Sequence, residues 1–305
     1  MVRSNEGGAD LKCLIDADVL LHELGWSSQF PDKDTGEQIL FSSEKACEML
    51  DKKIEVIQEE CMADDPPTLY VSSSDWIVKA WNKNAKWNDR EQMVHEPNFR
   101  YEVAVTKPYK GTRKNPKPFH FKNLFIHMIE NYDVVVSSGG LEADDMVCIA
   151  QRTAIDAGEE TIVCSRDKDL RIVQGWHYSW ECGKQPSHGP VETDSLGHIY
   201  QRITVNKTTK KETMDIFGYG LAFFLAQMIM GDGADNIPGL TGQGKAAAWK
   251  LLHPLEGDKE AQIKAVKDAY KEKAKDKSKE LFLEQAQLLF MRQHDNQPFD
   301  IRKLK

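Results

Sequence analysis

The stretch LKCLIDAD, residues 11–18, indicates the fold class of this chain. It is an apolar run of strand length that ends in two acids, Asp16 and Asp18. Near-continuous apolar runs are typical of strands that are buried on both faces of a parallel sheet. Four further strands are expected at 68–73 (TLYVSS), 101–106 (YEVAVT), 132–138 (YDVVVSS) and 161–167 (TIVCSRD).

Helix-length segments at 43–62, 119–131 and 142–157 lie between these strands. The alternation predicts an α/β fold, a doubly wound and mostly parallel sheet with flanking helices. The polar, Trp-rich residues 76–100 are expected to form a flexible or helical excursion above the sheet. Later, HIYQRITVN (198–206) and KKETMDIFG (210–218) predict a hairpin, and the pattern from 219 onward is helical. We therefore expect an α/β domain at 1–214 and a helical region at 215–305.

Composition predicts a cytoplasmic protein with no membrane partner. The chain of 305 residues, 40% of them hydrophobic, can bury a large core. It begins with the polar sequence MVRSNEGGAD, and its longest apolar stretch, 221–230, is about half a membrane span. The six cysteines show no CxxC spacing, so we expect reduced core thiols rather than disulfides or zinc ligands.

Ten carboxylates fall in five short clusters, mostly where an apolar run ends. In an open parallel sheet the carboxyl ends of the strands converge on one crevice. Acids gathered there repel each other unless divalent cations neutralise them, and an all-oxygen site suits Mg²⁺ or Mn²⁺ rather than Zn²⁺. Two such ions catalyse displacement at phosphorus, which predicts a metal-dependent phosphodiesterase. The ten acids are Asp16, Asp18, Asp75, Glu142, Asp144, Asp145, Asp167, Asp169, Asp232 and Asp235.

Each acid cluster also has an ordinary structural interpretation. Asp16 and Asp18 fit a helix cap or a turn. Glu142, Asp144 and Asp145 fit the first turn of a helix, where negative charge complements the helix dipole. Their order at successive strand ends is what favours the metal site.

The net charge of −8 does not exclude a nucleic-acid partner, because the ten clustered acids account for it. Residues 107–122 contain six basic side chains, three prolines and no acid, which predicts a substrate-facing loop. Residues 264–279 carry seven lysines and three acids; there we expect a solvated helix face with i,i+4 ion pairs.

The segment GDGADNIPGLTGQGKAAAWKLL, residues 231–252, predicts a contact with phosphate. Its glycines Gly239, Gly242 and Gly244 form a tight hairpin that opens onto a helix beginning with Lys245. Backbone N–H groups at a helix start, together with a lysine, bind anions. The arrangement suits sequence-independent contact with a DNA backbone, although an ordinary helix-turn-helix packing element has the same pattern.

The order LIDAD, YKGTR, LEADD, SRDKD and GDGADNIPGLTGQGKAAAWKLL resembles the 5′-nuclease superfamily over about residues 11–252. That superfamily includes flap endonucleases, the 5′→3′ exonuclease domain of bacterial DNA polymerase I and stand-alone phage exonucleases, and the chain is most similar to the last. The resemblance implies two Mg²⁺ ions, replaceable by Mn²⁺. One would be held by Asp16, Asp75, Glu142 and Asp144, and the other by Asp145, Asp167, Asp169 and the segment with Asp232 and Asp235. Asp18 is an additional acid that either joins the first ion or hydrogen-bonds beside it.

The resemblance also implies DNA contacts. Lys110 and Arg113 would contact the scissile phosphate, Tyr109 would stack on an unpaired base, and Arg100 matches an upstream basic position. The glycine hairpin, with Lys245, corresponds to a helix-hairpin-helix element that grips duplex DNA, often with a monovalent cation such as K⁺. The implied activity is 5′→3′ exonuclease hydrolysis of DNA with 5′ ends, nicks or flaps. RNA–DNA hybrids and replication proteins are further candidate partners, and a phage-encoded chain would act in the host cytosol.

Two other functions fit parts of the pattern. A haloacid-dehalogenase-type phosphatase would use Asp16 as nucleophile and Asp18 as general acid, but needs a β-strand before Asp232. Residues 221–230 instead have helical composition. A non-catalytic DNA-binding module would not favour ten clustered acids.

Overall fold

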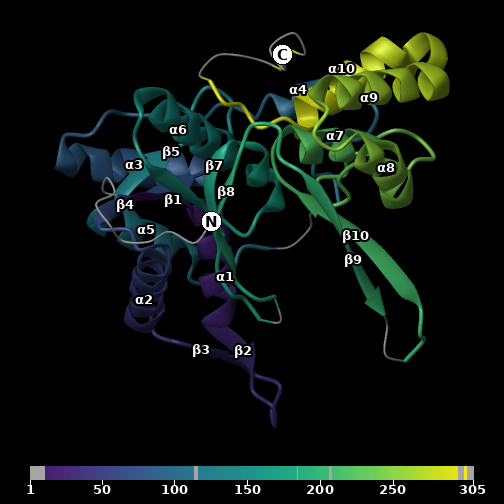
Figure 1. Cartoon of the computed structure of the whole chain (residues 1–305). Helices are drawn as coiled ribbons and strands as arrows, with labels where there is room; N and C mark the ends of the chain where they lie inside the picture. The colour runs from purple at the N-terminus through teal and green to yellow at the C-terminus, as the bar shows by residue number, and fades with distance from the viewer. Residues whose placement is uncertain (1–10, 113–115, 184, 206–207, 295–298, 301–305) are drawn as a thin grey trace. The chain divides into compact units, whose positions relative to one another are not determined.

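The computed structural model describes residues 11–112, 116–183, 185–205, 208–294 and 299–300 (Figure 1). The chain forms two compact units. The first, here called the sheet unit, comprises Met1–Asn98, Lys114–Asp167 and Gly175–Glu192. The second, the helical unit, comprises Phe99–Arg113, Lys168–Gln174 and Thr193–Lys305. The main segment of the helical unit begins at Thr193 rather than at residue 215, and two short earlier segments also belong to this unit.

The sheet unit is built on a six-stranded sheet in the order β5-β4-β1-β6-β7-β8. The pairs β1–β4, β4–β5, β1–β6 and β6–β7 are all parallel, as expected. The chain fills the sheet in one direction from β1 and then in the other, so the topological switch point lies at β1. The strands are β1 (Lys12–Asp16), β4 (Asp65–Val71), β5 (Asp133–Val136), β6 (Thr161–Cys164), β7 (Gly175–Ser179) and β8 (His188–Thr193).

Helices cover both faces of this sheet, which confirms the doubly wound fold. Along β1, Cys13 and Ile15 belong to the core formed with α1 (Ala17–Ser27), α2 (Ser43–Cys61) and α5 (Phe121–Asn131). The opposite face packs against α6 (Ala143–Ala157), which contacts β1, β4 and β6 (Figure 1). The remaining elements are α3 (Asp75–Asn88) and the short strands β2 (Gln29–Pro31) and β3 (Gln38–Leu40).

The helix expected at 43–62 is confirmed as α2, and its sequence explains its ends. Ser42 caps the helix by accepting a hydrogen bond from the Lys45 backbone N–H at 3.2 Å. The helix ends at Met62, whose φ of 51° is left-handed. Its buried side chains recur at helical spacing and enter the core: Ala46, Leu50, Ile54, Ile57 and Cys61. The helices expected at 119–131 and 142–157 are confirmed as α5 and α6.

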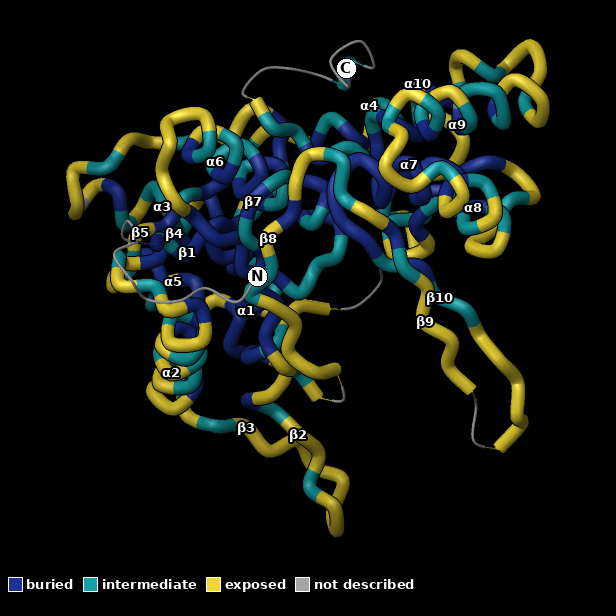
Figure 2. Tube along the Cα trace, in the orientation of Figure 1, coloured by how far each residue is buried: buried dark blue, intermediate teal, exposed yellow. Residues whose placement is uncertain are grey.

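The helical unit contains the expected hairpin, β9 (Ile199–Val205) with β10 (Glu212–Gly218), and mostly helices after it. Helix α7 (Gly220–Met230) is apolar all round and buried, whereas the hairpin is largely exposed (Figure 2). Among the described helices, none is long and apolar enough to span a bilayer. The other elements are α4 (Arg100–Val103), η1 (Lys168–Ile172), α8 (Lys245–Leu252), η2 (His253–Leu255), α9 (Lys259–Ala274), η3 (Lys275–Lys277) and α10 (Ser278–Leu289).

The strand expected at 101–106 is wrong, because this segment contains the end of the short helix α4. Tyr101 and Val105 resemble strand residues but are exposed, at 57% and 85%. The buried residue is Arg100, whose guanidinium donates to the Leu288 carbonyl at 3.0 Å. Tertiary hydrogen bonding of one charged side chain has overridden local β propensity here.

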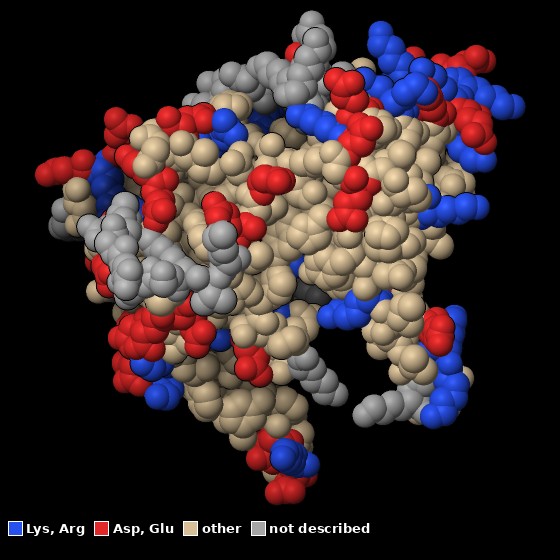
Figure 3. All heavy atoms as spheres, in the orientation of Figure 1, with Lys and Arg blue, Asp and Glu red and all other residues tan. Residues whose placement is uncertain are grey.

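The lysine-rich run 264–279 is a solvated surface, as expected. On α9, Asp268 accepts from Lys264 at 2.7 Å and from Lys271 at 3.2 Å. Lysines and acids intermix over α9 and α10 (Figure 3).

Candidate metal and nucleic-acid site

The central strand β1 ends in Asp16, whose side chain is buried. One carboxylate oxygen, Oδ2, accepts a hydrogen bond from the Ser165 hydroxyl at 2.7 Å. That hydroxyl in turn accepts from the Asp167 backbone N–H at 2.9 Å. The other oxygen of Asp16, Oδ1, is buried and has no hydrogen-bond partner among the described residues. Burial raises the pKa of Asp16 to about 7, and the nearby charges of Asp18 and Asp167 act in the same direction.

Asp18 connects three elements of the sheet unit. It lies in the first turn of α1, and its carboxylate accepts from the Ser72 backbone N–H, just after β4, at 3.2 Å. The Ser72 hydroxyl accepts from the Ala143 backbone N–H at 2.9 Å, at the start of α6. Burial lowers the pKa of Lys117 below its usual value, and the nearby charge of Asp18 offsets only part of this effect. Asp18 is therefore hydrogen-bonded to the backbone that follows β4 and interacts with Asp16, and a role at the first ion stays a prediction.

The LEADD acids lie at the start of α6. Asp145 is fully buried and accepts from the Glu142 backbone N–H at 3.2 Å, which caps the helix. Asp144 is half-buried in the same turn. The structure thus places Asp18 and Asp167 within electrostatic range of Asp16. Ser72 links Asp18 to the start of the helix that carries the LEADD acids.

Asp75 is not a partner in the hydrogen bonds that connect these acids. It is exposed in the first turn of α3, four positions beyond the last residue of β4. The helix is capped by Ser74, which accepts from the Ile77 backbone N–H at 3.3 Å. A metal-binding role for Asp75 stays a prediction.

In the helical unit, Lys168 joins two of the expected metal-binding acids. Its ammonium lies 2.9 Å from Asp169 Oδ1 and 2.5 Å from Asp232 Oδ2. The buried Gln227 of α7 donates to Asp169 Oδ1 at 2.5 Å. Burial raises the pKa of Asp232, but the charge and hydrogen bond of Lys168 outweigh it and hold that pKa below its usual range. The second expected ion draws ligands from both compact units, so that ligand set stays a prediction.

The YKGTR segment is fixed against Asp235. The Tyr109 hydroxyl donates to Asp235 Oδ2 at 3.0 Å, and the Lys110 backbone N–H donates to the Asp235 carbonyl at 2.9 Å. Lys110 has a left-handed φ of 52°. Tyr109 is only 4% exposed and packs edge-on against Tyr101, so stacking on a base would require this ring to become exposed. Arg113 lies outside the described residues.

Arg100 is a structural residue rather than a surface cation. It is 0% exposed and donates to the carbonyls of Leu288 and Phe290, at the end of α10, at 3.0 and 3.3 Å. A DNA contact by Arg100 stays a prediction, and it would require this buried guanidinium to leave its carbonyl partners.

The glycine hairpin divides into a packed part and an open part. At Gly239, φ is 65°, and a Cβ atom would lie 2.3 Å from the Gly231 nitrogen, so the fold itself requires glycine there. At Gly242 and Gly244 a Cβ atom would meet nothing within 4 Å. Gly244 is the N-cap of α8, and the next residue, Lys245, forms an ion pair with Asp215 of β10. The open part has room for a ligand at the helix start, whereas Gly239 serves packing.

The sequence analysis did not identify four residues that hydrogen-bond to these acids: Ser72, Ser165, Lys168 and Gln227. The serines directly follow β4 and β6, so their position at the strand ends was a usable signal. Gln227 is a single amide within an apolar helix, and buried amides require partners.

No family model matches the chain. Its curated relatives include DNA polymerase I of Streptococcus pneumoniae serotype 4 (strain TIGR4) and of strain R6, at 31% and 30% identity over 162 residues. That segment is 50% of this chain but 16% of each polymerase, so the chain spans a small part of these relatives. The crystal structure of the T5 D15 protein, co-crystallised with metal ions, aligns with 92% of this chain and 88% of its own. The identity is 14% and the TM-score 0.51.

The chain shares the fold of the T5 D15 protein, a mixed α/β fold with a mostly parallel central sheet and flanking helices. The fold expected from the sequence resemblance is therefore confirmed, although at 14% identity the T5 likeness concerns the fold alone. The segment before Asp232 is helix α7, not a strand. The haloacid-dehalogenase alternative needs a β-strand at this place, so the structure does not support it.

Proposed function

We propose that this protein is a divalent-metal-dependent 5′ nuclease that hydrolyses phosphodiester bonds of DNA from the 5′ end. The observation that carries the proposal is Asp16, a buried carboxylate at the switch point of the sheet with two further acids near it. Because anions gathered around a buried carboxylate are unfavourable without cations, the arrangement favours a metal site. The fold and the polymerase relatives favour a nuclease over other metal-dependent enzymes.

The donor set fits a hard divalent ion. Asp16 Oδ1 is a buried oxygen without a partner, and the surrounding ligand candidates are carboxylates, which suit Mg²⁺ or Mn²⁺. When bound, two such ions supply an activated water and stabilise the leaving 3′-oxygen. The residues that would hold them are Asp16, Asp75, Glu142, Asp144, Asp145, Asp167, Asp169, Asp232 and Asp235, with Asp18 beside them.

The protein's own side chains position these ligands and the substrate. Ser165 orients Asp16, and Lys168 holds Asp169 and Asp232. Lys110 and Arg113 would neutralise charge that develops on the non-bridging phosphate oxygens. The positions around Gly242, Gly244 and Lys245 would hold a duplex phosphate, with K⁺ as a candidate ion.

The proposed substrates are DNA duplexes with 5′ ends, nicks or flaps, and RNA–DNA hybrids are a second class. Replication proteins are proposed partners and the cytoplasm the proposed location, in a host cell if the chain is phage-encoded. Exonuclease and flap cleavage would use the same acids, so product lengths must distinguish them.

The test is a time course on 5′-labelled duplex, nicked and flap DNA with Mg²⁺ or EDTA. We expect Mg²⁺-dependent release of 5′-phosphorylated products and a loss of several orders of magnitude in Asp144→Asn, with DNA binding retained. Asp156→Asn, at the C-terminal end of the same helix α6, is the matched control. A non-catalytic DNA-binding module would bind DNA and never cleave it. Cleavage by Asp144→Asn at the control rate under saturating Mg²⁺ would reject the metal assignment.

A further inference from the structure

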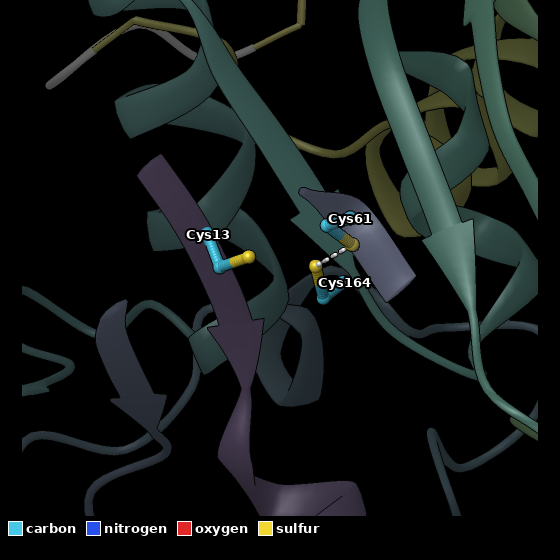
Figure 4. Close-up of side chains that lie close together, drawn as sticks. All are labelled: Cys13, Cys61 and Cys164. Carbon is cyan, nitrogen blue, oxygen red and sulfur yellow. Dashed lines mark hydrogen bonds between the residues drawn. The ribbon is translucent and has the colours of Figure 1, made fainter. Parts of the chain in front are cut away.

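Three thiols converge in the core of the sheet unit. Cys13 lies on β1, Cys164 is the last residue of β6 and Cys61 is the last residue of α2 (Figure 4). Their sulfur atoms all lie within 4.8 Å of one another, and the Cys61 and Cys164 sulfurs are 3.7 Å apart. All three residues are at most 1% exposed. We call this group the thiol cluster.

The sheet register explains why the thiols meet. Cys13 pairs with Ile162, and Ile15 pairs with Cys164, so the two cysteines are two positions apart on neighbouring strands. Both therefore point to the same face of the sheet. Helix α2 packs on that face, and its buried stripe ends in Cys61. The cluster is thus fixed by three regular elements of one compact unit.

The spacing suits a single ion bonded to all three sulfurs. Thiophilic ions bind sulfur at about 2.3 Å, which places three sulfurs around one centre roughly 4 Å apart. The observed separations need only small side-chain adjustments to reach that geometry. In the described part of the chain, the cluster contains no histidine, carboxylate or fourth cysteine. Structural zinc takes four ligands, so the cluster is one ligand short for zinc.

The net charge of the complex with three thiolates distinguishes the remaining thiophilic ions. The cluster lies in an apolar core, where an uncompensated charge is costly. Three thiolates leave a net charge of −2 with Cu⁺ and −1 with Cd²⁺, but none with a trivalent centre such as As(III). We propose that Cys13, Cys61 and Cys164 form a binding site for trivalent thiophilic species of the arsenite class.

The reaction balances without an oxidant or reductant. Arsenous acid, As(OH)₃, condenses with three thiols to give As(S-Cys)₃ and three water molecules. Three S–As bonds replace three As–O bonds, and each thiol proton leaves in a water molecule.

The test treats the reduced, full-length protein with sodium arsenite and measures intact mass after desalting. We expect one arsenic per chain with the loss of three protons, and a raised melting temperature because α2 becomes linked to β1 and β6. Peptide mapping after unfolding and alkylation should find Cys13, Cys61 and Cys164 protected and Cys47, Cys148 and Cys182 alkylated. This mapping needs no variant.

Cys61→Ser removes one of the three bonds and should weaken arsenite retention by about 100-fold. Cys47→Ser, on the same helix but outside the cluster, should retain arsenite as the unaltered protein does. Protection of any other set of cysteines, or unchanged retention in Cys61→Ser, would overturn the site. A two-proton loss without arsenic would indicate a disulfide instead, and tighter retention of Zn²⁺ or Cu⁺ than of arsenite would overturn the choice of ion.

Discussion

Asp16 is buried at the end of the central strand, where the charge of its carboxylate is unfavourable. Burial, followed by the charges of Asp18 and Asp167, raises its pKa from 3.8 to about 7. The folded protein therefore binds a proton at this site more tightly than the unfolded chain does. Without divalent metal, this group makes the protein less stable as pH rises from about 4 to 7, and the loss levels off above that range.

Asp16→Asn should remove this pH-dependent loss of stability. The amide cannot ionise, so in EDTA the variant should gain on the unaltered protein between pH 5 and 8, by on the order of 2–4 kcal/mol. Thermal melting of both proteins across this range measures the difference. Mg²⁺ should stabilise the unaltered protein and not the variant, because ligand binding to the native state raises its stability. A difference that stays constant with pH would contradict the raised pKa.

At the scale of single elements, the glycines that precede α8 have two different roles, one in packing and a proposed one in DNA binding. Gly239 is required by packing, whereas Gly244 borders open space. Gly239→Ala should therefore lower the melting temperature, and Gly244→Val should leave it almost unchanged. The valine should instead weaken duplex binding about equally across sequences, because backbone contacts carry no sequence information.

Lys245 adds a charge to the same helix start. Its ion pair with Asp215 is half-exposed, so we ascribe little stability to it. Lys245→Ala should make duplex binding less salt-dependent, lowering the log–log slope by roughly 1. Lys250→Ala, in the last turn of α8, is the control. Affinity measured against salt on duplex and short single-stranded DNA tests this role. Equal losses on both substrates would place the helix start in the active site or the core rather than on the duplex.

At the scale of the whole molecule, the sequence predicted the parts whose pattern is local. The strands β1, β4, β5 and β6 are apolar runs with acids or serines at their ends, and α2 has an uninterrupted buried stripe. The hairpin pairing of β9 with β10 followed from alternating residues around a turn. Order along the chain was sufficient to identify these elements, whereas the strand order of the sheet came from the structure.

What the sequence could not predict depends on long-range contacts. Arg100 reads as a basic surface residue, but its partners, Leu288 and Phe290, lie nearly 190 positions away. Lys168 lies between two expected metal ligands in sequence, yet its bond to Asp232 spans 64 positions. Composition also could not show that Cys13, Cys61 and Cys164 meet, because sheet register and a helix end bring them together.

The role of Arg100 allows a test of how the two compact units depend on each other. Its guanidinium satisfies carbonyls at the end of α10 and contacts the Phe99 ring at 4.7 Å. Arg100→Met keeps much of the side-chain volume but leaves these buried carbonyls unpaired, at a cost of about 1–3 kcal/mol each. Arg152→Met, on α6 of the sheet unit, is the control. Hydrogen exchange should accelerate in α4 and α10, while β1, β4 and β6 keep their protection. Acceleration of equal size in those strands would show that the two units unfold as one. Loss of DNA affinity without faster exchange would instead support the expected DNA contact of Arg100.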